Sequence, residues 1–191
     1  MRAIFATLLL LAATSVLAKN VQLPSNVTLK PGNRSGDYID TVSHEVRGAA
    51  FAKLKLCVAE NVSNSPTSIR GGTDVPFQFQ SNNVATTTVV GGGETFKYQD
   101  ESLGTLIAIG TTDGGPSALG LSREVIRFEV KAVADADRTV LRFANITRAT
   151  ADTGSVTNAG FIPVGAWRGA KPLAVIETLQ ALGSRLDSCL Q

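Results

Sequence analysis

The chain has 191 residues, and its 18 basic residues are nearly balanced by 16 acidic ones. A balance so close to neutral argues against electrostatic attraction to nucleic acid, anionic lipid or acidic substrates. Aromatic residues make up only 6% of the chain, and Trp167 is the sole tryptophan, so neither base-stacking platforms nor aromatic carbohydrate-binding strips are expected. We therefore expect no nucleic-acid partner.

Residues 1–18 are typical of a secretory signal peptide. Met1 and Arg2 give a short basic start, residues 4–13 are apolar or small, and Val-Leu-Ala precedes Lys19. The apolar run is far shorter than the roughly 20 residues that span a bilayer, so we expect cleavage and no transmembrane anchor. The expected location is periplasmic or secreted.

We predict an extended N-terminal arm over residues 19–40, where prolines and glycines interrupt a polar sequence, with room for one edge strand. A single α+β domain is expected over 41–191. Its first element is predicted to be a helix from about Thr41 to Val62, since apolar residues recur at every fourth position. These are Val46, Ala50, Leu54 and Val58. Thr41 or Ser43 would cap this helix.

Alternating residues predict antiparallel strands through the middle of the chain. Short strands are expected at 77–79 and 86–90, with Gly91–Gly93 as a turn. Further strands are expected over 95–99, 105–111, 123–132 and 138–148. Ile126, Phe128 and Val130 should face the core on one side of their strand, as should Leu141 and Phe143 of its partner after the Asp135–Asp137 turn.

A C-terminal helix is predicted to begin at Pro172 and to run to the end of the sequence. Its apolar residues recur at steps of three and four: Leu173, Ile176, Leu179, Leu182, Leu186 and Leu190. The predicted fold is therefore a curved antiparallel sheet of four or more strands, covered on one face by an N-terminal and a C-terminal helix. Cys57 and Cys189, the only cysteines, are predicted to form a disulfide between these helices in an oxidising compartment.

Three segments resemble a bacterial envelope domain family of unknown function with a TATA-binding-protein-like fold. Residues 49–62 resemble its opening helix, residues 96–110 its pair of strands around a glycine turn, and residues 126–146 its long amphipathic strand and the following one. The chain departs from the family at the Asp135–Asp137 turn and in having the two cysteines. The family has no assigned catalytic residues, so the resemblance implies a fold and a compartment and no site.

The sequence offers few groups for catalysis. His44 is the only histidine, and a Ser-His-Asp triad would have to use it. One histidine with two distant cysteines does not make a zinc site. The acidic residues Asp135 and Asp137 are interpreted as a turn, in preference to a carboxylate pair or calcium site. The glycine-rich segments lack phosphate-binding and dinucleotide-binding order, so we expect no cofactor, no metal and no catalytic residue.

A possible interaction surface is provided by basic residues on the wet face of two strands. They are Arg123, Arg127 and Lys131 on one strand and Arg142 on its neighbour, with Arg138 and Arg148 as further candidates. The alternatives are a cationic face for an anionic envelope polymer and an ordinary solvated sheet face that opposes aggregation. Trp167, with Phe161 and Pro163, either closes the core or forms a partner-binding tip.

Three functions follow from these observations. The preferred one is an exported, non-enzymatic envelope protein that acts as a protein- or polymer-interaction module. A small-molecule or lipid carrier would use the concavity between sheet and helices. A small hydrolase would require His44 in a cleft beside Ser, Asp or Glu. The ligand, the partner and the oligomeric state are left open by the sequence.

Overall fold

The computed structural model describes residues 21–32, 36–73, 84–117, 120 and 122–191. The expected signal peptide and the expected strand at 77–79 lie outside these residues. Within the described residues, nine strands, two α-helices and a short 3-10 helix follow one another. They are β1 (Val27–Lys30), β2 (Tyr38–Arg47), α1 (Phe51–Asn61), β3 (Thr67–Thr73), β4 (Val84–Val90), β5 (Phe96–Asp100), β6 (Thr105–Pro116), β7 (Arg123–Val133), β8 (Arg138–Thr150), β9 (Ile162–Pro163), η1 (Arg168–Ala170) and α2 (Pro172–Leu190).

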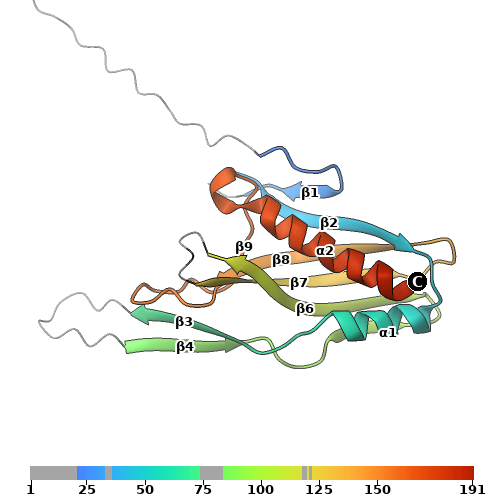
Figure 1. The fold of residues 1–191 in the computed structure, drawn as a ribbon, viewed down its shortest axis with the longest axis horizontal. Coiled ribbons are helices and arrows are strands. Elements are labelled where there is room, and N and C mark those ends of the chain that lie inside the picture. The colour runs from blue at the N-terminus through green and yellow to red at the C-terminus, as the bar shows by residue number, and fades with distance from the viewer. Residues whose placement is uncertain (1–20, 33–35, 74–83, 118–119, 121) are drawn as a thin grey trace, which may run out of the picture.

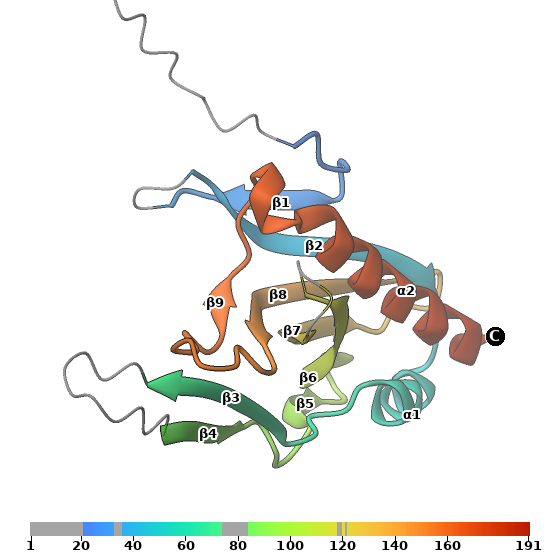
Figure 2. The same ribbon diagram turned by 60° about the vertical axis from the view of Figure 1, so that its left-hand side comes forward.

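The main sheet is antiparallel and has seven strands, where we expected four or more. Its order is β1-β2-β8-β7-β6-β5, and the short β9 pairs with β8. Strands β3 and β4 form a separate two-stranded ribbon that extends away from α1 (Figures 1 and 2). The chain is thus α+β, with a mostly antiparallel sheet and two helices.

The expected helix over residues 41–62 is wrong in its first half. Residues 38–47 form β2, which pairs with β1 on one side and β8 on the other. Around Val46 the spacing of the apolar residues fits one face of a helix and also one face of a strand. The β-branched residues of β2 favour the strand. Gly48 follows the last residue of β2 and lies against the β7–β8 turn. A side chain does not fit at this position, because a Cβ there would collide with the carbonyl of Ala136. The helix begins only at Phe51, so neither Thr41 nor Ser43 caps it.

The alternation in β7 and β8 is confirmed. Phe128 and Val130 of β7 and Leu141 and Phe143 of β8 are at most 1% exposed, and the two phenylalanine rings pack edge to face with centroids 5.5 Å apart. Every second residue of β7, and of β8 as far as Phe143, therefore faces the helix side of the sheet, and the residues between them face away from it.

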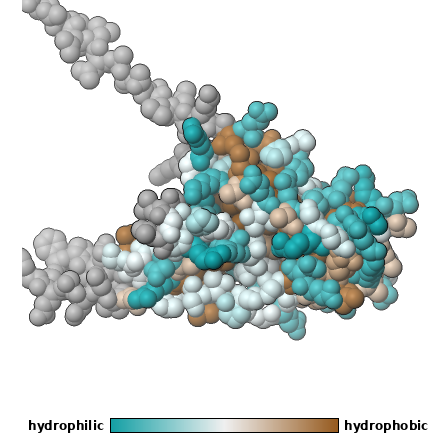
Figure 3. Space-filling model, viewed as in Figure 1, coloured by the Kyte–Doolittle hydropathy of each residue, from teal (hydrophilic) through white to brown (hydrophobic). Residues whose placement is uncertain are grey.

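Helix α2 has the predicted bounds at both ends and buries one apolar stripe against β2 and β6. Val175 is buried in it, whereas Leu173, which we assigned to the stripe, is 41% exposed. The backbone N–H of Arg47 donates to the carboxylate of Asp187 at 2.8 Å and so fixes the end of β2 to α2. Figure 3 shows that the outer side of the helix layer is mainly hydrophilic or neutral, with isolated hydrophobic residues.

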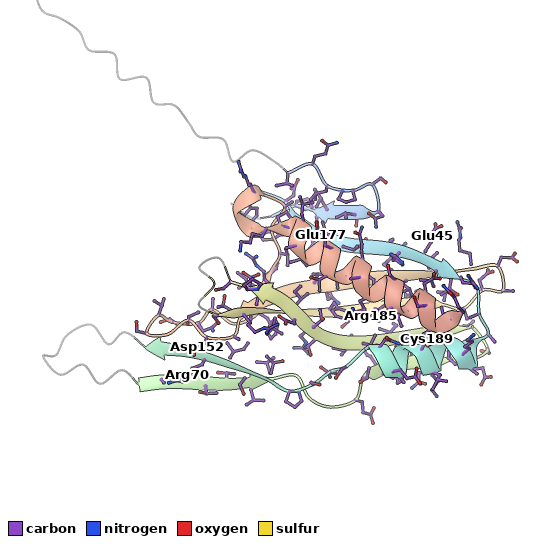
Figure 4. The ribbon with its side chains drawn as sticks, viewed as in Figure 1. Glu45, Arg70, Asp152, Glu177, Arg185 and Cys189 are labelled. Carbon is purple, nitrogen blue, oxygen red and sulfur yellow. A yellow bond between two sulfur atoms is a disulfide. The ribbon has the colours of Figure 1, made fainter. Side chains whose placement is uncertain are left out.

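The expected cover of the sheet by an N-terminal helix is not shown, because α1 packs mainly on α2 and makes only a smaller contact with β6. The buried residues Leu54, Cys57 and Val58 of α1 join the same core cluster as α2 and the main sheet. Cys57 is bonded to Cys189 in the last turn of α2, with their Cα atoms 5.7 Å apart (Figure 4). The disulfide expected from the sequence is therefore present. None of the helices in the described ranges is long and apolar enough to cross a membrane.

His44 lies on β2 and its ring faces α2, which corrects its expected place at the start of a helix. The ring sits against Gly183, where an added Cβ would approach the His44 Cγ atom to 2.5 Å. Gly183 is buried in the middle of α2, a position at which glycine costs about 1 kcal/mol relative to alanine. The glycine is nevertheless required here, because only a residue without a side chain lets α2 approach the imidazole ring this closely.

We predict that Gly183→Ala destabilises the protein by about 1–3 kcal/mol, since overpacking against His44 outweighs the gain in helix propensity. The double variant Gly183→Ala with His44→Ala should recover most of this loss, because the small side chain at position 44 makes room for the methyl group. Urea unfolding of both single variants and the double variant gives the coupling energy. A Gly183→Ala variant more stable than the natural chain would contradict this account of the contact.

Loss of the disulfide is expected to lower the free energy of unfolding by about 5 kcal/mol, an upper-range value from the loop-entropy model for a sequence separation of 132 residues. Cys57→Ser, Cys189→Ser and the double variant should give similar losses, because each removes the same covalent bond. Denaturant unfolding with and without reductant measures the effect. Two titratable thiols in the native protein would show that the bond is absent.

Candidate binding surface

Lys131 and Arg142 lie directly opposite each other on β7 and β8. Both are exposed, on the face of the sheet away from the helices, because their neighbours in sequence are buried on the helix side. Arg127 lies four residues before Lys131 on β7, a distance of about 13 Å along the strand, and is partly exposed. We call Arg127, Lys131 and Arg142 the cation row.

Arg148 does not belong to this face, contrary to our expectation. Between the pairs Arg127–Thr147 and Glu129–Ala144, strand β8 contains one more residue than β7, which is a β-bulge. Asn145 in this bulge has a φ of 51°, a left-handed conformation that asparagine tolerates better than most residues. The extra residue reverses the direction of the side chains that follow, so Arg148 comes to the helix side of the sheet.

There Arg148 forms an ion pair with Glu124, whose carboxylate accepts a hydrogen bond from Nη1 at 3.3 Å. The two side chains are only 18% and 13% exposed. Water therefore screens their attraction less than that of the exposed pairs on the molecule. This pair fixes the distal ends of β7 and β8 to each other.

Other basic residues of the predicted surface are neutralised by acidic partners. Arg123 is paired with Asp113, and Arg138 donates to both carboxylate oxygens of Glu45 at 3.2 and 3.3 Å. Glu129, which interrupts the basic residues of β7, accepts from Lys97 at 2.9 Å. Within the described part of the chain, no salt bridge engages any member of the cation row.

Two cations directly opposite on neighbouring strands repel each other and destabilise the sheet slightly. Their charges are available to a bound anion, and a guanidinium group can hold a carboxylate, sulfate or phosphate through two parallel hydrogen bonds. Because the cation row extends for about 13 Å along β7, it can engage several charges of one extended ligand.

Trp167 is not brought to the cation row. It lies just before η1 and packs edge to face on Tyr38 at the start of β2, with ring centroids 5.5 Å apart. Tyr38 is five residues from Ser43, the partner of Arg142 on β2, or roughly 16 Å along the strand. Gly165 has no room for a side chain, because a Cβ there would collide with the indole ring. Trp167 is partly buried and closes the end of the sheet beside the start of α2.

The acidic residues noted in the sequence form turns. The carboxylate of Asp135 accepts from the backbone N–H groups of Asp137 and Arg138, and these bonds lower its pKa from 3.8. The carboxylate of Asp100 accepts from the Ser102 hydroxyl and the Leu103 N–H, which likewise lower its pKa. Among the described residues there is no cluster of three or more acidic, histidine or cysteine residues that could hold a metal ion.

His44 has no catalytic neighbourhood in the part of the chain that the structure describes. No hydrogen bond joins its ring to a described Ser, Asp or Glu side chain, and its ring is held against the backbone of α2 at Gly183. The interior between sheet and helices, where a carrier would need a cavity, is filled by side chains that are at most 2% exposed. These include Leu106, Phe128, Phe143, Leu179, Leu182 and Leu186.

Two small cavities lie instead beside the segment 157–160. One, of about 230 Å³, is lined by Ile69 and Val90 of the β3–β4 ribbon, and the other, of about 210 Å³, is lined by Glu124 and Arg148. A shallower hollow of about 470 Å³ adjoins the Asp135–Asp137 turn. The sequence contained no signal for the first cavity, because it arises where the ribbon meets a loop more than sixty residues away in the chain. The second lies between that loop and the ends of β7 and β8.

Comparison with known proteins adds little to this geometry. No family model matches the chain, and no curated protein matches it. A solved structure described as a DUF4468 family protein from Bacteroides ovatus is similar over 79% of this chain and 81% of its own, with a TM-score of 0.43 and 10% sequence identity. A similarity at this level carries no argument about the site, so the cation row is described from the residues of this chain alone.

The bulge at Asn145 leads to a prediction about stability. Asn145→Gly should be tolerated, whereas Asn145→Val should cost about 1–2 kcal/mol, because a β-branched residue resists the left-handed conformation. Thermal unfolding of both variants measures the difference. Equal stability of the valine and glycine variants would mean that position 145 does not require a positive φ.

Proposed function

We propose that the protein is an exported, non-enzymatic envelope protein that binds an anionic polymer, or an anionic partner protein, on the outer face of its sheet. The observation that carries this proposal is the cation row. Arg127, Lys131 and Arg142 share one face without acidic partners among the described residues, whereas Lys97, Arg123, Arg138 and Arg148 are each ion-paired. An uncompensated group of like charges costs stability, and binding of an anion offsets that cost.

The weakness of exposed ion pairs favours a polymer over a small anion. Each exposed pair contributes about 0.2–1 kcal/mol, so a single sulfate or carboxylate would bind this face poorly. A chain with repeated negative charges can engage all three side chains and pays the cost of association only once. The near-neutral total charge of the protein also means that attraction would be confined to this face.

Export is part of the same proposal. A disulfide between Cys57 and Cys189 is compatible with an oxidising compartment, and the first eighteen residues have the composition of a signal peptide. We also propose membership in the envelope domain family with a TATA-binding-protein-like fold, supported by the segment from α1 onward, in which one helix is followed by antiparallel strands and the C-terminal helix α2. A non-catalytic role is supported by the placement of His44 against α2.

We predict that the double variant Arg127→Glu with Arg142→Glu binds dextran sulfate and polyglutamate about tenfold less tightly or worse, because two attractive contacts become repulsive. The slope of affinity against salt concentration should fall as well, because fewer cations are engaged. Fluorescence anisotropy of labelled polymer, titrated at several salt concentrations, measures both quantities.

The matched control is Arg123→Glu with Arg138→Glu, which changes the net charge by the same amount at positions where each arginine already has an acidic partner. It should retain most of the affinity. Unchanged binding by the Arg127 and Arg142 variant would remove the proposal. An equal loss in the control would show that net charge, and not the cation row, attracts the polymer.

A further inference from the structure

Among the described residues, the outer edge of β4 pairs with no other strand. In the described residues β4 forms a ladder with β3 alone, and this ladder runs without a register shift over all seven residues. The outer edge of β3 is already occupied, because the N–H of Arg70 donates to the carbonyl of Ala151 at 2.8 Å and that of Thr153 donates back to Arg70 at 3.1 Å. Arg70 and Asp152 lie close together where the ribbon meets this loop (Figure 4).

This edge lacks the features by which proteins protect exposed strands. The sequence of β4, Val-Ala-Thr-Thr-Thr-Val-Val, contains no charge, proline or glycine, and residues 85–89 are exposed, Val89 by 63%. The edges of the main sheet differ. The β1 edge is only four residues long, has a register shift and carries Lys30, while β5 has a register shift and carries Lys97. Protected edges elsewhere and an open edge at β4 indicate that β4 is paired when the protein functions.

We propose that β4 pairs with β4 of a second copy of this chain, antiparallel and about a two-fold axis at Thr87. The sequence of the strand is nearly symmetric about that residue. In this register Thr87 lies opposite Thr87 of the second copy, Thr86 opposite Thr88, and Ala85 opposite Val89. Threonine pairs and β-branched residues are favourable across antiparallel strands.

Charge also favours a second copy as the occupant. The strand has no charge, so two identical edges approach without repulsion. In a two-fold interface the same residues face each other in both copies, and the near-symmetric sequence of β4 meets this condition. The two ribbons would form a continuous four-stranded sheet. A contact of one strand with one strand is small for a protein interface, so association should be weak and dependent on concentration.

The test measures the mass of the full chain in solution by sedimentation equilibrium, from low micromolar to millimolar protein. We expect a reversible monomer–dimer equilibrium for the natural chain. Thr87→Lys should shift the dissociation constant upward by at least about tenfold, because it places two positive charges opposite each other. The control Leu103→Lys adds the same charge at an exposed turn of the main sheet, and it should leave the equilibrium unchanged. Circular dichroism and melting temperature verify that both variants fold.

Cysteine crosslinking tests the register. A cysteine at position 87 would lie opposite itself at a Cα separation of about 4.5–5.5 Å, which suits a disulfide. Thr87→Cys should therefore give a covalent dimer on mild oxidation. Val89→Cys should not, because the two copies of residue 89 would be about 13 Å apart.

Three results would overturn the proposal: a monomer at every concentration, a dimer that Thr87→Lys leaves intact, or crosslinking through Val89→Cys with none through Thr87→Cys. Growth beyond the dimer would also overturn it, because a closed two-fold pair leaves no free β4 edge.

Discussion

The alternation of side chains in β7 and β8 is the constraint on which the rest of this structure depends. Once Phe128, Val130 and Phe143 are buried in the core, Lys131 and Arg142 must point to the other side, because successive residues of a strand face opposite ways. The hydrophobic core thus determines the position of the basic residues as strictly as it determines its own packing. The position of the cation row is thus a direct consequence of the burial of phenylalanine and valine on the opposite face.

The β-bulge at Asn145 limits the length of that surface. Without it, alternation would continue and Arg148 would extend the basic face toward the end of β8. With it, Arg148 turns to the helix side, where Glu124 neutralises its charge. One residue with a positive φ therefore places Arg142 and Arg148 in two different environments, the first exposed and without an acidic partner among the described residues, the second largely buried and paired.

The sequence allowed the strands and the last helix to be predicted where one period dominated. Leu179, Leu182 and Leu186 recur at helical spacing with no competing pattern, and the strand around Phe128 alternates over its whole length. Around Val46 two periods fitted the same residues, and the pairing of β2 with β8, which sequence does not reveal, decided for a strand. The candidate surface was only partly predictable. Its residues could be named, but the pairing of Arg123 with Asp113 and of Glu129 with Lys97 depends on contacts that only the folded sheet creates.

The disulfide has a consequence for how the chain matures. Its two sulfur atoms are separated by 132 residues, and strands β3 to β9 all lie between them. The bond therefore cannot close until those strands have been made and α2 has reached α1. Because the sequence contains only two cysteines, one intramolecular pairing is possible and no incorrect one has to be reshuffled. An oxidant is then sufficient to complete the fold, and a disulfide isomerase has nothing to correct.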